Sequence, residues 1–394
     1  ISSEWDRIEY TLQKENFWLF LNETGYENPT RIDFIFELMC ERNILGLEEN
    51  ELRYIGTDKD KSFRYFYQYF SREKASINFC WEQVKALFNT FVEWYDDLQL
   101  YHYVGFLIAC RPTELTKLVG LWERSEDKSH FLQSLKKGIK VEIFRPLPKG
   151  YLFNSEVKAK TACKPMLLFH NIQTVINRNA KGQNDQIGQE GTFHSIPFGL
   201  IPFYKFPFHL FKKENWDVEH INSSTDNEEG DTNTQGEWLL NYYLSVSDEM
   251  KELISLYFNT KADDEKKRLY QKIKRNLPKQ NSWPQEDKNK IWNYTLLDRS
   301  TNRSYGNAIF AAKRRIIIGK DKGVLLPIPK LSRDKKLNFG EEKEADSAFV
   351  PPCTRNVFMK YYSPTIGDNN YWTRETDAQG YLNDIIACLE QLNK

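Results

Sequence analysis

A run of apolar side chains at helical spacing constrains the first half of the chain more than any other feature. It lies in 81-WEQVKALFNTFVEWYDD-97. The apolar positions recur every three or four residues for three turns: Val84, Leu87, Phe88, Phe91, Val92 and Tyr95. Side chains with this period share one face of a helix, and that face is stable only when another element covers it. The segment therefore predicts a long helix inside a packed helical domain.

Two further segments of this half have the same period. One is 30-TRIDFIFELMCER-42, where Thr30 and Asp33 form a T-x-x-D helix start, and the other is 113-TELTKLVGLWER-124. Aromatic residues make up 14% of the chain, and many of them fall on these stripes. We assign them to the core rather than to a cofactor box or a base-stacking platform, because burial is the usual meaning of this period. Residues 1 to about 200 are expected to be mostly helical.

Composition restricts the class of protein. Hydrophobic residues make up 40% of the 394 residues and charged residues 28%, which is typical of a globular chain. No apolar run approaches the ~20 residues that span a bilayer, so no membrane contact is expected. The chain starts 1-ISSEWDRIEY without Met or signal peptide, and we expect a piece of a longer protein. The six cysteines form no C-x-x-C pair, which favours a reducing, cytoplasmic setting.

Charge is balanced overall but uneven along the chain. There are 55 basic and 55 acidic residues, so net charge alone does not indicate a nucleic-acid partner. Between Ala311 and Phe339, however, nine Lys or Arg stand against two Asp. This segment could contact phosphates, or it could be a solvated charged face, and taken alone it fits both interpretations.

The rest of the chain is punctuated by polar stretches. We interpret 138–153 as a connection with a short strand, and 165–176 as an apolar helix. The polar stretch 177-NRNAKGQNDQIGQEG-191 predicts a linker that holds the domain boundary, so that the domains are 1–190 and 191–394. The residues from 222 to 236 contain no apolar side chain and predict a mobile surface loop.

Four more elements are expected in the second half. Two helices are predicted at about 237–257 and 262–276. A strand is predicted at 291-IWNYTLLD-298, and a helix at 306–317.

Two stretches of the second half combine into one chemical pattern. The first, 216-WDVEHIN-222, places Glu219 next to His220, and Asn293 opens the second, 293-NYTLLDRSTNRSYGN-307, 73 positions after His220. Cleavage of a phosphodiester needs a base, a group that orients the base, and an electrophile such as a divalent cation. A strand carrying an acidic residue and His, a strand carrying Asn, and a turn carrying Asn302 before a basic helix would supply these groups.

The pattern E-H-I, N-x-T-L-L and N-R-S-x-G-N-x-x-F-x-x-K-R resembles the His-Me-finger (HNH-type) nuclease domain of the GmrSD family. These are nucleotide-dependent, modification-dependent restriction endonucleases of bacterial phage defence. Segments 7–22, 31–39 and 93–108 resemble the helical region of that family, and 349–363 resembles the end of its nuclease domain. The ParB-like nucleotide-binding domain that precedes these regions in the family has no counterpart here.

The resemblance implies a fold and a cofactor. The fold would be α+β and predominantly α: an N-terminal helical bundle followed by a ββα-metal nuclease domain with helical insertions. One Mg2+ or Mn2+ would bind per active site, and a nucleotide would act only through the absent N-terminal domain. The partner would be phage DNA, and a homodimer would allow both strands to be cut.

The resemblance also implies residue roles. His220 would be the general base, Asn293 would orient it, and Glu219 and Asn302 would bind the metal. The remaining candidates would support the loop or bind DNA phosphates: Asn307, Lys313, Arg314 and Arg315.

Several points stay open at this stage. Asp217 competes with Glu219 as the metal ligand, because neighbouring residues of a strand point to opposite faces. Asn302 could also be a helix N-cap, and Lys313 could be a solvated charge. Asn222-Ser223-Ser224 stands where family members commonly have Pro and Gln. The alternative function is a catalytically inactive DNA-binding or oligomerisation module of a defence sensor.

Overall fold

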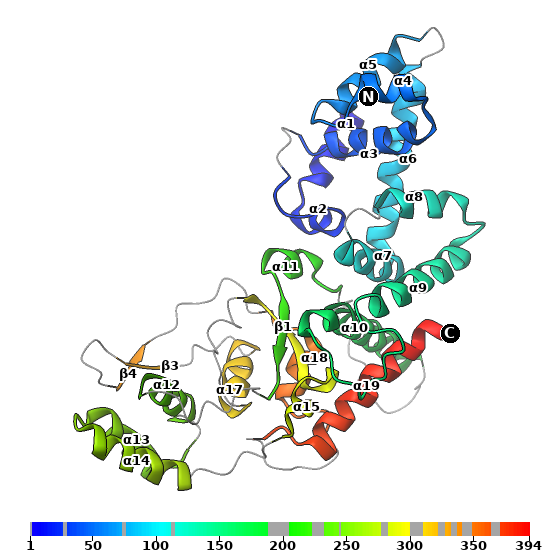
Figure 1. Cartoon of the computed structure of the whole chain (residues 1–394). Coiled ribbons are helices and arrows are strands. Elements are labelled where there is room, and N and C mark those ends of the chain that lie inside the picture. The colour runs from blue at the N-terminus through cyan, green and yellow to red at the C-terminus, as the bar shows by residue number, and fades with distance from the viewer. Residues whose placement is uncertain are drawn as a thin grey trace. The chain divides into compact units, whose positions relative to one another are not determined.

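The computed structural model describes most of the chain as helix, with two small antiparallel sheets (Figure 1). The predominantly helical fold expected from the apolar stripes is therefore confirmed. The residues that the structure describes are 2–26, 30–72, 76–111, 115–187, 205–222, 232–243, 246–276, 283–299, 310–321, 328–331, 337–340, 349–363 and 371–394.

The contacts divide the chain into two compact units. Unit 1 contains Ile1–Glu142 and Val175–Lys213, and unit 2 contains Ile143–Thr174 and Glu214–Lys394. A single cut near residue 190 does not describe this grouping, because the segment 143–174 belongs with the C-terminal half. It does so through polar bonds such as that from the backbone N–H of Cys353 to Asn171 Oδ1, at 2.9 Å.

Unit 1 is built from short helices around an aromatic core. Helix α6 runs over Ile77–Asp96 and buries four residues of the predicted stripe, while Val92 and Tyr95 are partly buried; the four are Val84, Leu87, Phe88 and Phe91. Ser76 caps its first turn, and Asp97 caps the next helix, α7. The other helices are α1 Ser2–Leu12, α2 Glu15–Leu21, α3 Asp33–Asn43, α4 Glu49–Ile55, α5 Lys61–Phe70, α7 Leu98–Cys110, α8 Leu115–Arg124 and α11 Phe208–Lys213.

The start of helix α3 is not capped by the expected T-x-x-D motif. Helix α3 has Ile32 at its N-cap, with no side-chain cap from the T-x-x-D motif. Instead the Glu9 carboxylate accepts the backbone N–H groups of Arg31 and Ile32, at 3.1 and 2.9 Å. A carboxylate from another helix thus satisfies donors that precede α3.

Two segments expected to be irregular are helical. Helix α9 covers Lys128–Phe144, so 138–144 is not a connection with a strand. Its buried apolar residues are spaced by four, at Phe131, Leu135, Ile139 and Ile143. The helix ends at Phe144, because Pro146 disfavours a helical conformation of the residue before it. Helix α10 covers Lys164–Ile187, so most of the polar stretch after Ile176 continues the helix. Once a helix is nucleated, each added residue gains a hydrogen bond.

Unit 2 contains both sheets. Strand β1 (Asp217–His220) pairs antiparallel with β2 (Tyr294–Leu297), and β3 (Ile328–Leu331) pairs with β4 (Leu337–Gly340). Strand β2 lies inside the predicted strand 291–298. Between β1 and β2 the chain forms helices α12 Thr232–Tyr243, α13 Asp248–Asn259, α14 Asp263–Asn276 and α15 Gln285–Lys288. The predicted helix at 237–257 is thus two helices, and α12 begins inside the stretch expected to be a loop.

Helices of unit 2 cover the first sheet. Helix α18 (Pro352–Phe358) packs on β2, and α17 (Phe310–Asp321) packs on α18. The last helix, α19 (Gln379–Glu390), packs on the turn before β2. A ββα-metal motif is not established by these elements, because residues 300–309, between β2 and α17, lie outside the described residues.

The six cysteines are all free thiols. No helix within the described ranges combines the length and the apolar character that crossing a bilayer requires.

Candidate functional site

Strands β1 and β2 bring the two predicted stretches together. Their register pairs His220 with Tyr294 and Glu219 with Thr295, and Asn293 stands directly before β2. The backbone N–H of Ile221 donates to the carbonyl of Asn293 at 2.8 Å, which extends the pairing by one bond. Residues 220 and 293 are therefore neighbours, although 73 positions separate them in the sequence.

The Asn293 side chain fixes the backbone that follows His220. It is fully buried and makes three hydrogen bonds. Its Oδ1 accepts the backbone N–H of Asn222 at 2.8 Å, and its Nδ2 donates to the carbonyls of Asn222 at 3.1 Å and Lys288 at 2.9 Å. These bonds go to backbone atoms rather than to the imidazole. Asn293 thus holds the exit of β1 in place, which is a less direct way of orienting His220 than the sequence suggested.

The imidazole of His220 lies in a partly buried, cationic setting. Its ring packs against Tyr294 with centroids 4.9 Å apart, and Asn289 is its hydrogen-bonding neighbour. Its Nε2 atom is buried and has no hydrogen-bond partner. Burial lowers the pKa of His220 to about 4; Lys313 and Lys160 lower it further, against the opposing effects of Glu219 and Asn289. The ring is therefore neutral at physiological pH.

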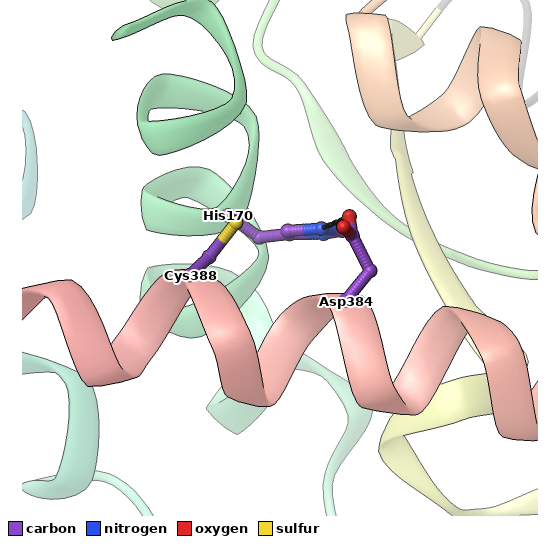
Figure 2. A group of neighbouring side chains, drawn as sticks. All are labelled: His170, Asp384 and Cys388. Carbon is purple, nitrogen blue, oxygen red and sulfur yellow. Dashed lines mark hydrogen bonds and ion pairs between the residues drawn. The ribbon is translucent and has the colours of Figure 1, made fainter. Parts of the chain in front are cut away.

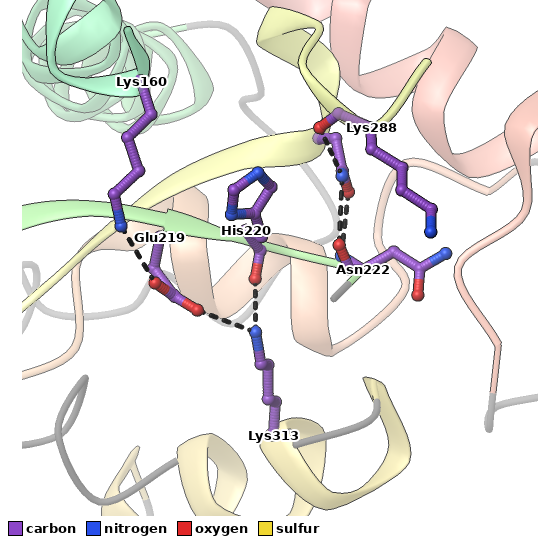
Figure 3. Close-up of polar contacts among 7 residues, drawn as sticks. Lys160, Glu219, His220, Asn222, Lys288 and Lys313 are labelled. Carbon is purple, nitrogen blue, oxygen red and sulfur yellow. Dashed lines mark hydrogen bonds and ion pairs between the residues drawn. The ribbon is translucent and has the colours of Figure 1, made fainter. Parts of the chain in front are cut away.

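Beside His220, two lysines hold the Glu219 carboxylate. Lys313 Nζ donates to Glu219 Oε1 at 2.9 Å and to the backbone carbonyl of His220 at 2.6 Å. Lys160 Nζ approaches the other oxygen, Oε2, at 3.5 Å. Figure 3 shows both lysines meeting this carboxylate, with Lys313 reaching it from the side of β1 opposite the imidazole. Burial lowers the pKa of Lys313, and Glu219 opposes that shift.

This arrangement bears on the expected metal ligands. Glu219 points away from the imidazole and is engaged by lysines, so it does not fit a cation shared with His220. Asp217, two residues earlier, lies on the same face of the strand as Glu219. Its Oδ1 accepts the backbone N–H of Val218 at 2.7 Å. Neither carboxylate of β1 is therefore arranged to share an ion with the imidazole.

The remaining predicted residues fall into two groups. Asn302 and Asn307 lie outside the described residues. Arg314 and Arg315, on α17, are half-buried, and burial lowers the pKa of each guanidinium. Lys313 is buried to 1% exposure of its side chain, so its observed contacts are with β1 rather than with solvent.

Sequence reasoning missed the partners that surround His220. Asn289 joins the exposed Glu156 (Nδ2 to Oε1, 2.8 Å) and Tyr294 (OH to Oδ1, 3.3 Å). Lys160 belongs to a short 3-10 turn, Lys160–Cys163, which packs on β1. No motif marked these residues, because their proximity arises from chain segments far apart in the sequence.

A basic surface on helix α14 was also not predicted from the sequence. Helix α14 lines a surface hollow with Lys267, Arg268, Gln271, Lys272, Arg275 and Asn276. The repeated basic residues in 265-EKKRLYQKIKRN-276 were the available signal. Phosphate groups are the natural ligands of such a surface.

No known protein family, curated protein or solved structure matches the chain. The likeness to the GmrSD family therefore depends on the motif residues alone.

Proposed function

We propose that unit 2 is a metal-dependent endonuclease that hydrolyses phosphodiester bonds in DNA, with His220 as the general base. As the resemblance implies, it would be the nuclease part of a bacterial modification-dependent restriction system. The observation that carries the proposal is the state of His220: a neutral imidazole with one buried nitrogen free of partners, on a strand whose exit is fixed by Asn293.

Each neighbouring residue has a part in this proposal. A neutral imidazole accepts a proton from the attacking water, whereas an imidazolium does not. The Asn293 side chain and the Lys313 bond to the His220 carbonyl fix the backbone on which the ring is mounted. Lys313 and Lys160 together exceed the charge of Glu219 by one, and this excess favours the neutral ring and attracts an anionic substrate.

The cation is proposed on the resemblance alone. A divalent ion would polarise the phosphate and stabilise the departing oxygen. Of its expected ligands, Asn302 lies outside the described residues and Glu219 is held by Lys313 and Lys160. We therefore assign no step to it. The expected products are a 5′-phosphate and a 3′-hydroxyl, and one active site per chain would cut one strand at a time.

Plasmid nicking by the full chain tests the proposal. Supercoiled plasmid would be incubated with the wild type in Mg2+ or Mn2+, with His220→Gln, and with His130→Gln as the control. His130 is exposed and belongs to unit 1. We expect the wild type and the control to nick DNA and His220→Gln to lose at least 100-fold in rate. Equal nicking by all three proteins would overturn the assignment of His220.

An inactive DNA-binding module is the second candidate, and the engagement of Glu219 by two lysines favours it. This alternative predicts that the wild type retards DNA in a gel but nicks none in either metal. It also predicts that charge reversal on α14, for example Lys272→Glu, weakens retardation while His220→Gln leaves it unchanged. Nicking that depends on His220 would exclude it.

A further inference from the structure

Three helices of unit 2 bring metal-binding side chains to one point away from β1. His170 extends from α10 and Asp384 and Cys388 from α19, and Cys353 of α18, whose Sγ lies 3.3 Å from Thr174 Oγ1, neighbours the imidazole. Asp384 and Cys388 are four residues apart, so they share one face of α19. The donor atoms of His170, Asp384 and Cys388 all lie within 4.8 Å of one another (Figure 2).

The imidazole at the centre of this cluster is buried among metal-binding groups. His170 is fully buried, and its Nε2 lies 2.7 Å from Asp384 Oδ2. Its Nδ1 is buried and makes no hydrogen bond of good geometry. The groups beside the ring are the thiols of Cys353 and Cys388, which together with Asp384 act on its pKa as hydrogen-bonding neighbours. The buried ring is thus surrounded by a carboxylate and two thiols, all of which are groups that bind transition metals.

A bound transition metal explains this set of donors. We propose that His170, Asp384 and Cys388 bind a zinc ion and that Cys353 completes a tetrahedral site. Zinc takes nitrogen, sulfur and carboxylate oxygen at about 2.0–2.3 Å, which places ligand atoms ~3.3–3.8 Å apart. Thiol donors disfavour Mg2+ and Ca2+, which prefer oxygen.

The helices need little movement to form the site. The three donors that already lie within 4.8 Å would close by up to roughly 1–1.5 Å, and the 2.7 Å contact between His170 and Asp384 would open by about half an ångström. Asp384 keeps 41% of its side chain exposed and gives the ion a route from solvent. On binding, His170, whose pKa is raised, and both thiols lose their protons to solvent, and the zinc then joins α10, α18 and α19.

Metal titration of the full chain tests this site without any activity assay. Protein stripped with a chelator would be titrated with Zn2+ against a chromophoric chelator, and with Co2+ to observe the thiolate charge-transfer absorption. We expect one zinc per chain at this site and a thiolate signal with Co2+. A wild type that binds no Zn2+, or whose Co2+ complex lacks the thiolate signal, would overturn the proposal.

Variants assign the ligands. Cys388→Ser and Cys353→Ser should each weaken zinc binding at least tenfold, whereas Cys163→Ser, at another buried cysteine of unit 2, should not. His220→Ala should also leave it unchanged, which separates this site from the proposed nuclease centre. Zinc affinity retained in Cys388→Ser or in Cys353→Ser would contradict that ligand set. If a variant fails to fold, the Co2+ spectrum of the wild type still decides the question.

Discussion

His170 is buried and His220 is partly buried, both in unit 2, and their electrostatic settings are opposite. Around His220, burial lowers the pKa to about 4, and Lys313 and Lys160 add to that shift while Glu219 opposes it. Around His170 burial also disfavours the charged form, but Cys353 and Asp384 outweigh it and hold the pKa well above its usual value. The first ring is therefore kept neutral, whereas the second favours its own protonated, positively charged form.

The difference shows that the charged groups around a histidine determine which role its side chain suits. A neutral imidazole with an open nitrogen suits proton abstraction. An imidazole among thiols and a carboxylate suits a cation, whether a proton or a metal ion. Burial alone does not separate these two roles, because both rings are desolvated; the sign of the surrounding charge does.

Lys313→Met would break the setting of His220 most strongly. Lys313 is buried and pairs with Glu219, so its removal leaves a carboxylate that only Lys160 approaches. We expect a loss of about 3 kcal/mol in unfolding free energy, and a higher pKa for His220, because Lys313 lowers it. Urea denaturation of the full chain measures the first effect.

Lys160→Met is the matched control. Its side chain is 35% exposed and lies farther from Glu219, so the cost should stay below about 1 kcal/mol. Glu219→Gln added to Lys313→Met should recover part of the loss, since the uncompensated charge is then gone. Equal losses of unfolding free energy in Lys313→Met and Lys160→Met would contradict the stabilising role of the buried Lys313–Glu219 pair.

Asn293→Ala should have the next largest effect. It removes three hydrogen bonds and leaves backbone groups of Asn222 and Lys288 without their partners. We expect a loss of roughly 2–3 kcal/mol and slower nicking, because the exit of β1 is no longer fixed. Thermal unfolding and nicking rates measured on the same preparation test this. A variant with wild-type stability and rate would show that the Asn293 side chain does not hold the exit of β1.

Asp384→Asn tests the electrostatic setting of His170. In chelator-treated protein it removes the anion beside His170, and because Asp384 is 41% exposed the cost should be only about 1 kcal/mol. The pKa of His220 should not change. Urea midpoints and histidine NMR of the variant test both statements, and a shift at His220 would show that the two settings are not independent.

The smallest effect concerns pH. A base with a pKa of about 4 is almost wholly neutral at pH 5.5, so nicking should change less than twofold between pH 7 and pH 5.5. A base with the ordinary pKa of about 6.5 would lose roughly eightfold over this range. Activity should be lost only as the pH falls toward 4. A rate profile with its acid limb near pH 6.5 would contradict the cationic setting.

Local patterns predicted local structure well. The stripe through Phe91 gave helix α6, and the β-branched and aromatic run after Asn293 gave β2. The closeness of residues 220 and 293 also followed from motif spacing. By contrast, the polar end of α10 was misjudged, because polar side chains on a helix and in a linker look alike in sequence.

The burial of Lys313 and the other neighbours of His220 could not be predicted. Lys313 was a candidate site residue, but it stands in a basic run that looks like solvated charge, and its pairing with Glu219 allows it to be buried. Asn289 and Lys160 reach the site through non-local packing that carries no periodic signal. The cluster at His170 was missed for the same reason, since its residues are spread from 170 to 388.

Chemical rescue tests the role of His220 most directly. Nicking by His220→Ala would be measured with increasing imidazole, beside the wild type. The account predicts a rate at least 100-fold below wild type without imidazole, and partial recovery when imidazole supplies the missing base. Nicking by His220→Ala at the wild-type rate without imidazole would contradict it.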